Sequence, residues 1–426
     1  MTAETIYALS SGSPPAAIAV VRISGPAADA AVTALAGKLP EPRVATLATL
    51  RDADRAKLDT ALVLRFPGPA SATGEDVAEL HLHGGRAVVA SVLKALAAMP
   101  GLREAQPGEF TRRAFENGRI DLAEAEGLAD LLEAETESQR RAALSLAGGA
   151  LSRLVARWQE SLTGLAAQLE AVIDFSDEGE VGEALPPGWR QAAEALRADL
   201  ADLLARPAVE RLRDGIRVVI AGPPNAGKSS LLNWLAGRQV AITSAIAGTT
   251  RDLVEAPTAI GGTPFLLVDT AGLRESVDEI ESIGVGLARE SLDGADLLLW
   301  LGAPGECPRP ERALIVQSKI DISEPDPAAD VQVSSETGAG MDRLVALLIE
   351  RARGLLPAEG EVAVNARHRE AVREAADALQ QAVELDDVVL AAEAVRVARS
   401  ALDRVTGRGG VEDMLDALFG RFCIGK

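Results

Sequence analysis

Residues 222–229 read Gly-Pro-Pro-Asn-Ala-Gly-Lys-Ser and have the types and spacing that bind a triphosphate. The two glycines let successive backbone N–H groups point into one concavity, Lys228 reaches the β- and γ-phosphates, and Ser229 offers a hydroxyl to Mg²⁺. This pattern requires a strand before it and a helix after it, and the apolar runs 218–221 and 231–235 fit both. We interpret the segment as a P-loop; a glycine loop without a ligand is the alternative.

Two later segments could complete the phosphate site. Residues 247–252 read Ala-Gly-Thr-Thr-Arg-Asp and place Thr250 where a first switch would complete the Mg²⁺ shell while the γ-phosphate is present. The apolar run 264–268 ends in Asp269-Thr-Ala-Gly272. There Asp269 would hold Mg²⁺ through water, and the Gly272 amide would contact the γ-phosphate.

Residues 317–321, Gln-Ser-Lys-Ile-Asp, are the candidate base-recognition loop. Asp321 can accept hydrogen bonds from the N1 and N2 donors of guanine, which adenine lacks, so GTP is the predicted nucleotide. Ser318 stands where Asn is usual, which predicts weaker nucleotide binding. Residues 333–336 are the candidate for the last base-contacting loop. Only about a dozen residues, 302–313, precede this region, near the minimum for a parallel crossover, so we expect its helix to be short or missing.

The residue that orients the attacking water is less obvious. Leu273 occupies the position where a Ras-type GTPase carries glutamine. Glu281, in the acidic segment 275–282, is a candidate for this role, and an ordinary acidic surface loop is the alternative.

Helical patterns precede and follow the nucleotide motifs. Apolar residues recur at alternating steps of four and three from Leu151 to Val172, the stripe of a heptad repeat. We favour a seam inside one helical bundle over an intermolecular coiled coil, because sustained coiled coils run longer. Further helices are expected over 189–205, 365–405 and 411–419.

This order predicts that a nucleotide domain is inserted into a helical bundle, with its ends near Arg213 and Arg353 close together. The predicted fold class is a multidomain protein of mixed α/β and α structure. The expected domains are an N-terminal α+β domain, the first half of a helical domain, an inserted Ras-like GTPase domain and the second half of the helical domain, over 1–118, 119–212, 213–353 and 354–426.

The N-terminal part alternates strand-like runs at 17–23, 60–66 and 76–83 with a helical run at 85–99. His81 and His83 are at strand spacing, so both side chains point to one face. Zinc sites use three or four protein ligands. The one other histidine is His368, and no cysteine is nearby. We therefore predict a structural or ligand-adjacent role and no transition metal.

Length, net charge and cysteine count indicate the class of protein. A length of 426 residues predicts two to three domains. The formal net charge of −20 disfavours a general nucleic-acid-binding surface and anionic membranes, so any RNA contact needs a local basic patch or a partner. Two cysteines, Cys307 and Cys423, make no disulfide framework and fit a reducing compartment. No signal peptide or membrane-length apolar run is recognised, so we expect a cytosolic protein.

With these motifs placed, the chain closely resembles the MnmE (TrmE) family of bacterial tRNA uridine-modifying GTPases, of the TrmE-Era-EngA type. The resemblance covers essentially the whole length. The GTPase motifs alone would fit many translation-associated GTPases. The segments 74–85 (Gly-Glu-Asp-Val…His-Gly-Gly), 107–115 (Pro-Gly-Glu-Phe-Thr…Ala-Phe) and the terminal Cys-Ile-Gly-Lys, 423–426, are what single out this family.

The resemblance implies an N-terminal domain that binds tetrahydrofolate and forms a homodimer, and a complex with an FAD-dependent protein of the MnmG type. Together the two would add an aminomethyl or carboxymethylaminomethyl group to C5 of the wobble uridine of certain tRNAs, with a one-carbon unit from folate. The FAD would be on the partner. The residues that match the family's folate site are Arg22, Glu79, Arg119 and Lys426, with Cys423 as a possible addition.

The resemblance also implies a catalytic device. Dimerised GTPase domains would hold K⁺ against the phosphates, where negative charge develops in the transition state. Asn225, Ser244, Ile246 and Thr249 would form the K⁺ cage. Glu281 would orient the water with Thr249 and Thr250, and Ser229 and Thr250 would hold Mg²⁺. The full expected GTP-binding set is Asn225, Ala226, Gly227, Lys228, Ser229, Ser230, Ser244, Ala245, Ile246, Ala247, Gly248, Thr249, Thr250, Asp269, Thr270, Ala271, Gly272, Lys319, Asp321, Ser334, Ser335 and Glu336.

Two alternatives remain beside a tRNA-modifying GTPase. One is a regulatory or ribosome-assembly GTPase whose helical flanks bind a partner; folate binding by the N-terminal part would distinguish the two. The other, a folate-dependent methyltransferase acting alone, is disfavoured because no flavin-binding fingerprint accompanies the N-terminal domain.

Overall fold

The computed structural model describes residues 4–175, 185–237, 255–269, 291–358, 360–409 and 412–425. The chain divides into two compact units, one of Met1–Ala129 with Thr406–Lys426, and one of Asp130–Val405. The C-terminal segment therefore groups with the N-terminal part of the chain. Among the described residues, no helix is both long and apolar enough to cross a membrane.

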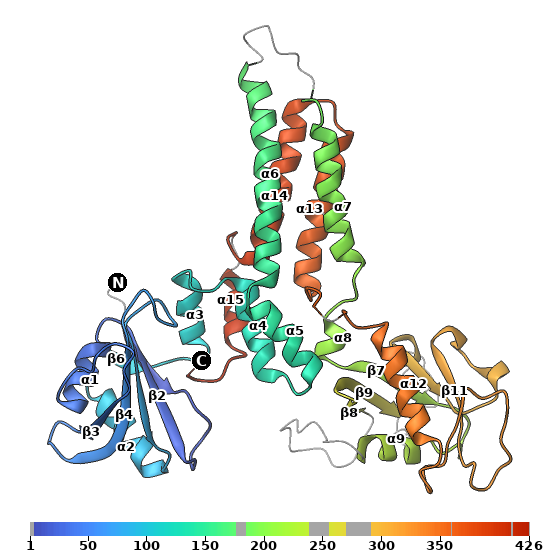
Figure 1. Ribbon diagram of the computed structural model, residues 1–426, viewed down its shortest axis with the longest axis horizontal. Helices are drawn as coiled ribbons and strands as arrows, with labels where there is room; N and C mark the ends of the chain where they lie inside the picture. Colours follow the sequence, from blue (N-terminus) through green and yellow to red (C-terminus); the bar gives the residue numbers. More distant parts are fainter. Residues whose placement is uncertain are drawn as a thin grey trace, which may run out of the picture. The chain divides into compact units, whose positions relative to one another are not determined.

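The first unit contains a six-stranded sheet of order β3-β4-β5-β2-β1-β6 (Figure 1). Alternate strand residues, such as Val21 and Leu80, are buried together with apolar residues of the two helices, such as Val32 and Val92. This period of two explains why one face of the sheet packs on the helices. Strands at 17–23, 60–66 and 76–83 and a helix at 85–99 were predicted, and β2, β4, β5 and α2 confirm them. The elements are β1 (Thr5–Leu9), β2 (Ile18–Ser24), α1 (Ala28–Ala36), β3 (Thr46–Arg51), β4 (Lys57–Phe66), β5 (Val77–His83), α2 (Arg86–Ala97) and β6 (Leu102–Glu104).

The C-terminal segment packs into this unit through close backbone contacts. Helices α3 (Glu109–Glu116), α4 (Leu122–Glu133) and α15 (Glu412–Phe419) contribute to one apolar cluster. Gly108 has φ +68, and a Cβ there would lie 2.2 Å from the carbonyl oxygen of Phe419. A Cβ on Gly425 would lie 2.1 Å from the Leu9 carbonyl oxygen, and Ile424 forms a β-bridge with Pro107. Only glycine fits these approaches.

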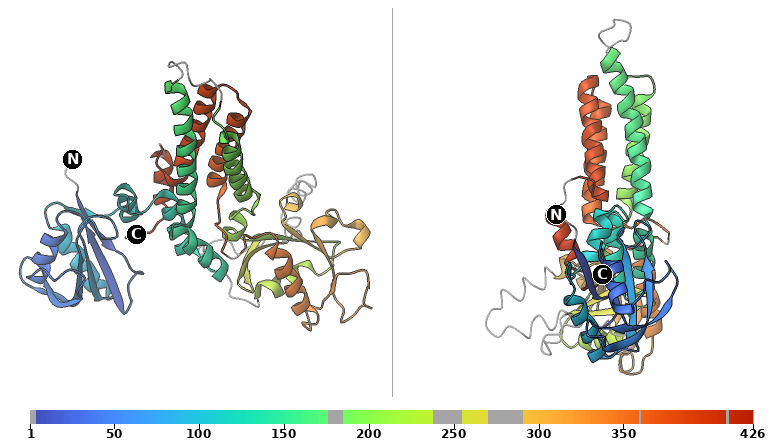
Figure 2. Two further views of the ribbon diagram at one scale, coloured as in Figure 1. Left: turned by 45° about the horizontal axis from the view of Figure 1, so that its top comes forward. Right: turned by 90° about the vertical axis from the view of Figure 1, so that its left-hand side faces the viewer.

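The second unit contains a helical bundle built from two distant parts of the sequence (Figure 2). Its helices are α5 (Glu137–Ala147), α6 (Ala150–Phe175), α7 (Trp189–Ala205), α13 (Ala366–Glu384) and α14 (Val388–Thr406). The heptad stripe of α6 from Leu151 to Leu169 is buried, and its partners belong to the same chain: Gln159 donates to Arg399 O of α14, and Trp189 of α7 donates to Leu165 O. The predicted intrachain seam is confirmed.

The nucleotide domain is a six-stranded sheet of order β12-β11-β10-β7-β9-β8, parallel except for the β8–β9 hairpin. Residues 301–312, all described, hold two short 3-10 turns, Pro304–Glu306 and Pro310–Arg312, in place of an α-helix, as expected. The other elements are α8 (Glu210–Arg213), β7 (Ile216–Ala221), α9 (Lys228–Gly237), β8 (Glu255–Ile260), β9 (Thr263–Asp269), β10 (Leu297–Trp300), β11 (Ala313–Gln317), β12 (Val331–Gln332) and α12 (Met341–Arg353).

The two connections to this domain lie side by side. Val209 N donates to Val364 O at 3.3 Å, and the Arg369 guanidinium donates to Arg206 O at 3.0 Å. The chain therefore enters and leaves the nucleotide domain at one place, as an inserted domain requires.

Candidate functional site

The P-loop connects the end of β7 to the start of α9. Gly222 has φ +151, and a Cβ there would lie 3.1 Å from Leu301; Gly227 has φ +88. Asn225, at the loop's exposed tip, has φ +60. These conformations, which L side chains rarely adopt, turn the backbone through the bend that the glycine spacing predicted.

Lys228 is 8 % exposed, and its Nζ donates to the carbonyl oxygens of Gly222 and Pro223 at 3.1 and 2.9 Å. Its cationic group therefore lies beside the P-loop backbone. Ser229 and Asp269 meet because β7 and β9 pair in parallel, with Ile220 opposite Asp269. The Ser229 hydroxyl donates to Asp269 Oδ2 at 2.6 Å. A hydroxyl in the first turn of α9 and a carboxylate at the end of β9 are oxygen ligands of the kind that Mg²⁺ takes.

The base-recognition loop is tied to the P-loop. Ser318 Oγ donates to Ala226 O at 2.6 Å, and Lys319 Nζ donates to Asn225 O at 2.8 Å. Lys319 has φ +60. Ser318, which replaces the usual Asn, thus still makes a direct contact with the phosphate loop.

The last two predicted base-contacting segments lie next to each other. Ile320 N donates to Val333 O at 3.3 Å, and Asp321 is exposed. Ser334 is fully buried; its N–H donates to Ala339 O, and its Oγ accepts from Thr337 N. Ser335 is half-buried and Glu336 exposed at this turn. The structure therefore brings the P-loop, Asp269, the 317–321 loop and the 334–336 turn to one edge of the sheet.

Several predicted residues lie outside the part of the chain that the structure describes, and their roles stay predictions. They are Ser244, Ala245, Ile246, Ala247, Gly248, Thr249, Thr250, Thr270, Ala271, Gly272, Glu281 and Lys426.

A second polar cluster lies on the N-terminal sheet. Arg22 and Glu79 are opposite each other on β2 and β5, and the guanidinium donates through Nε and Nη2 to Glu79 Oε1 at 3.0 and 2.8 Å. His81 Nε2 lies 3.3 Å from Glu79 Oε2, and the guanidinium of Arg22 lies 5.8 Å from the Phe110 ring centroid. Burial raises the pKa of Glu79, but Arg22 and His81 outweigh it, so this pKa is below its ordinary value.

Arg119 lies close to the loop that contains Gly74. A Cβ on Gly74 would lie 3.3 Å from Arg119 Cγ, and Gly74 has φ +82. The loop that contains Gly74 is joined to β2, since Ser24 Oγ lies 2.7 Å from both Thr73 Oγ1 and Glu75 Oε2. Arg119 therefore lies beside the loop that leads into β5, and β5 carries Glu79, the partner of Arg22.

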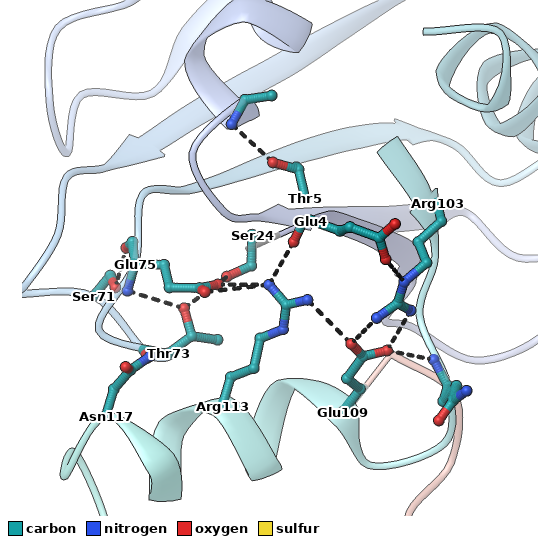
Figure 3. A network of polar contacts seen from close by, with 12 residues as sticks. Glu4, Thr5, Ser24, Ser71, Thr73, Glu75, Arg103, Glu109, Arg113 and Asn117 are labelled. Atoms are coloured by element: carbon teal, nitrogen blue, oxygen red, sulfur yellow. Dashed lines mark hydrogen bonds and ion pairs between the residues drawn. The ribbon is translucent and has the colours of Figure 1, made fainter. Parts of the chain in front are cut away.

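An ion-pair network that sequence reasoning missed supports this loop (Figure 3). Arg113 of α3 contacts Glu75 at 3.1 Å and Glu109 at 3.1 Å, and Arg103 donates to both Glu109 and Glu4. Glu75, Glu109 and Arg113 belong to the motif segments 74–85 and 107–115, but the pairing depends on contacts between segments that spacing alone does not reveal.

His83 contacts a different carboxylate from the one that His81 contacts. The ring Nδ1 of His83 lies 2.8 Å from Asp59 Oδ1, and the backbone N–H of His83 donates to Asp59 Oδ2 at 2.9 Å. The backbone N–H of Thr60 also donates to Asp59. Burial raises the pKa of Asp59, but these hydrogen bonds outweigh it and lower it below the ordinary value. His81 and His83 are thus held by different carboxylates. Within the described residues, no group of three or more His, Cys, Asp or Glu side chains is arranged to hold a metal ion.

Cys423 is exposed and precedes Ile424, whose bridge to Pro107 fixes the C-terminal segment against the first unit. The structure therefore places this thiol on the unit that carries Arg22 and Glu79.

Comparison with known proteins covers nearly the whole chain. A family model described as the MnmE helical domain matches residues 122–423, and one described as the N-terminus of the GTP-binding protein TrmE matches residues 5–119. Proteins named tRNA modification GTPase MnmE from Erythrobacter litoralis and Rhizorhabdus wittichii are 57 % and 58 % identical, each over 99 % of this chain and over 100 % and 97 % of those proteins. The one from Novosphingobium aromaticivorans is 54 % identical over 99 % of this chain and 100 % of that protein.

Proposed function

The chain belongs to the MnmE family of tRNA modification GTPases and is a GTP hydrolase, and we propose that it helps to add an aminomethyl or carboxymethylaminomethyl group to C5 of the wobble uridine of certain tRNAs. Its partner in this reaction is an FAD-dependent protein of the MnmG type. With tRNA as the substrate, the reaction takes place in the cytoplasm. The proposal is carried by the likeness to these GTPases over nearly the full length of this chain and of theirs. The contact between the P-loop serine, Ser229, and Asp269 agrees with it.

GTP occupies the edge where the P-loop meets the 317–321 loop. Ser229 and Thr250 hold Mg²⁺, with Asp269 acting through water, and Asp321 accepts the guanine N–H donors. Asn225, Ser244, Ile246 and Thr249 hold K⁺ when two GTPase domains meet. In support, Asn225 is exposed at the tip of the loop, next to the anchored Lys228. Glu281 orients the water, and K⁺ supplies positive charge where it develops during phosphoryl transfer.

A tetrahydrofolate derivative binds beside Arg22, Glu79, Arg119 and Lys426, and Cys423 is a possible neighbour. In support, Glu79 is an ionised acceptor held by Arg22, and carboxylates bind the N–H donors of heteroaromatic rings. The guanidinium of Arg22 lies over the buried Phe110 ring, which supports the position of Arg22 beside Glu79.

The open face of the N-terminal sheet favours a homodimer. Leu47 on β3 and Leu62 on β4 are directly opposite in register and 67 % and 43 % exposed. Ile18 on β2 is 60 % exposed. Apolar side chains in neighbouring positions of an uncovered sheet face are typical of an association surface.

Mass analysis of wobble uridines from cells lacking this chain tests the proposal. We expect the aminomethyl or carboxymethylaminomethyl group to be absent, with uridine that lacks this group in its place. Unchanged modification in the deletion strain would reject the proposal and favour the regulatory or ribosome-assembly alternative.

A further inference from the structure

Two side chains in the first turn of α5 reach the nucleotide domain. Ser138 Oγ donates to Gly262 O at 2.9 Å, and Gln139 Nε2 donates to Arg213 O at 3.2 Å. Gly262 is in the turn between β8 and β9, and Arg213 is the last residue of α8, three residues before β7. The helical bundle thus contacts the backbone just before each of two strands of the GTPase sheet.

The first turn of α5 is itself fixed by a capping box. Thr136 Oγ1 accepts from Gln139 N at 3.3 Å, and Gln139 Oε1 accepts from Thr136 N at 2.9 Å. The Gln139 amide therefore uses its oxygen to cap its own helix and its nitrogen to hold Arg213 O. Because the oxygen and the nitrogen of this amide are both hydrogen-bonded, the orientation of the Gln139 side chain is fixed.

The two strands that start at these contacts end at the phosphate site. β7 and β9 pair in parallel, from Ile216 opposite Phe265 to Ile220 opposite Asp269. β7 has 6 residues, about 20 Å at 3.3 Å per residue, and leads into the P-loop. β9 ends at Asp269. A shift of one strand start relative to the other therefore changes the separation of the P-loop and Asp269.

The strand starts are packed against each other with no spare room. Gly215 has φ +88, and a Cβ there would lie 3.0 Å from Phe265 C and 3.1 Å from Leu266 N. Because this approach leaves no gap, a displacement of the Arg213 end changes the position of the β7 start against β9.

Cavities flank the α5 contact. One of about 530 Å³ is bordered by Gln139, Arg213 and Pro257, and one of about 810 Å³ by Ser138, Gly262 and Arg353. The interface is therefore a narrow hydrogen-bonded contact between open spaces. That geometry allows the nucleotide domain to turn about α5, as hinge motions do, while Ser138 and Gln139 stay bonded.

We propose that Ser138 and Gln139 are positioning residues for GTP hydrolysis. They transmit the state of the helical bundle to the phosphate site by setting β7 against β9, and hence Ser229 against Asp269. Within the described part of the chain, neither side chain is hydrogen-bonded to a predicted nucleotide residue. The inference uses only the GTPase activity and is independent of folate, the flavin partner and tRNA.

The test measures kcat and KM for GTP with the full-length chain. Ser138→Ala removes the hydroxyl, and Gln139→Glu keeps the capping oxygen while it removes the donor to Arg213 O, since Glu and Gln both complete a capping box. We expect each substitution to lower kcat about fivefold with KM for GTP unchanged within about twofold. Ser138→Thr, which keeps a hydroxyl, should recover most of the lost kcat.

Ser161→Ala is the matched control, because Ser161 Oγ also makes one hydrogen bond, to Arg157 O, but at an exposed position within α6. It should leave kcat unchanged. Wild-type kcat in both Ser138→Ala and Gln139→Glu would overturn the proposal, even with a lowered melting temperature, since the contacts would then only hold the domains together. A raised KM with unchanged kcat, or no recovery with Ser138→Thr in a folded protein, would also overturn it.

Discussion

The hydroxyl of Ser229 donates to the carboxylate of Asp269 over 2.6 Å. The two residues are 40 positions apart in the sequence and meet because β7 and β9 are parallel neighbours whose carboxyl ends share one edge of the sheet. The contact joins the P-loop to the start of the Asp-Thr-Ala-Gly segment. In the proposed site, this contact marks where Mg²⁺ and the terminal phosphates of GTP would bind.

The proposed recognition of guanine depends on Asp321. Asp321→Asn replaces one acceptor oxygen by an N–H₂ donor, which faces the guanine donors and leaves at least one of them unpaired. We expect GTP affinity to fall at least about 100-fold, or ~2.7 kcal/mol, and XTP, which carries a C2 oxygen in place of the amine, to bind better than GTP. Titration with fluorescent GTP and XTP measures both. Equal GTP affinity in the variant would show that another group reads the base.

The tether between Ser318 and the Ala226 carbonyl should contribute to nucleotide binding. Ser318→Ala leaves that carbonyl without this donor and loosens the loop, so we expect GTP affinity to fall about fivefold, corresponding to ~1 kcal/mol for one hydrogen bond. Ser318→Thr keeps the hydroxyl and serves as the control. Wild-type affinity in Ser318→Ala would mean that Lys319 alone secures the contact.

Glu79 should make the first unit sensitive to acid. Burial raises the pKa of this carboxyl, and Arg22 with His81 outweighs burial, so the folded pKa lies below the ordinary value of 4.5. A lowered folded pKa contributes stability above the unfolded pKa, and this contribution is lost as the pH falls through the folded value. Glu79→Gln should therefore destabilise the chain by about 2 kcal/mol at pH 7, and the difference should shrink below about pH 4.5.

Denaturant unfolding of both proteins between pH 7 and pH 3 checks this sign. A constant difference across that range would show that the charge of Glu79 does not contribute to stability.

The fold was predictable where the pattern is local. The heptad stripe from Leu151 predicted a bundle seam, and the glycine spacing at residues 222–227 predicted a strand, a loop and a helix, because each depends on neighbouring residues. The association of Ile424 with Pro107 was not predictable, since it brings together segments more than 300 residues apart. The same holds for the pairing of Arg113 with Glu75, whose charges have many possible partners in the sequence. A glycine such as Gly108, which lies against Phe419, indicates that another backbone segment approaches closely. The sequence does not indicate which segment that is.

The proposed K⁺ site predicts a cation dependence. GTP turnover in K⁺ should exceed turnover in Na⁺ at equal ionic strength by at least about tenfold, or ~1.4 kcal/mol of transition-state stabilisation. Asn225→Ala should abolish this difference, because it removes the side-chain oxygen that we assign to the ion. Equal wild-type rates in the two salts would remove K⁺ from the mechanism.

We propose that GTP hydrolysis at the Ser229–Asp269 edge supports tRNA modification. The decisive measurement is the modification of wobble uridines in a deletion strain that carries the Asp269→Asn protein. The control is Asp202→Asn, at an aspartate on α7 whose side chain is 82 % exposed. We predict that the Asp269→Asn protein loses about 100-fold in kcat, ~2.7 kcal/mol, and leaves wobble uridines without the added group, while wild type and Asp202→Asn restore it. Full modification by a folded Asp269→Asn protein that hydrolyses no GTP would contradict the account.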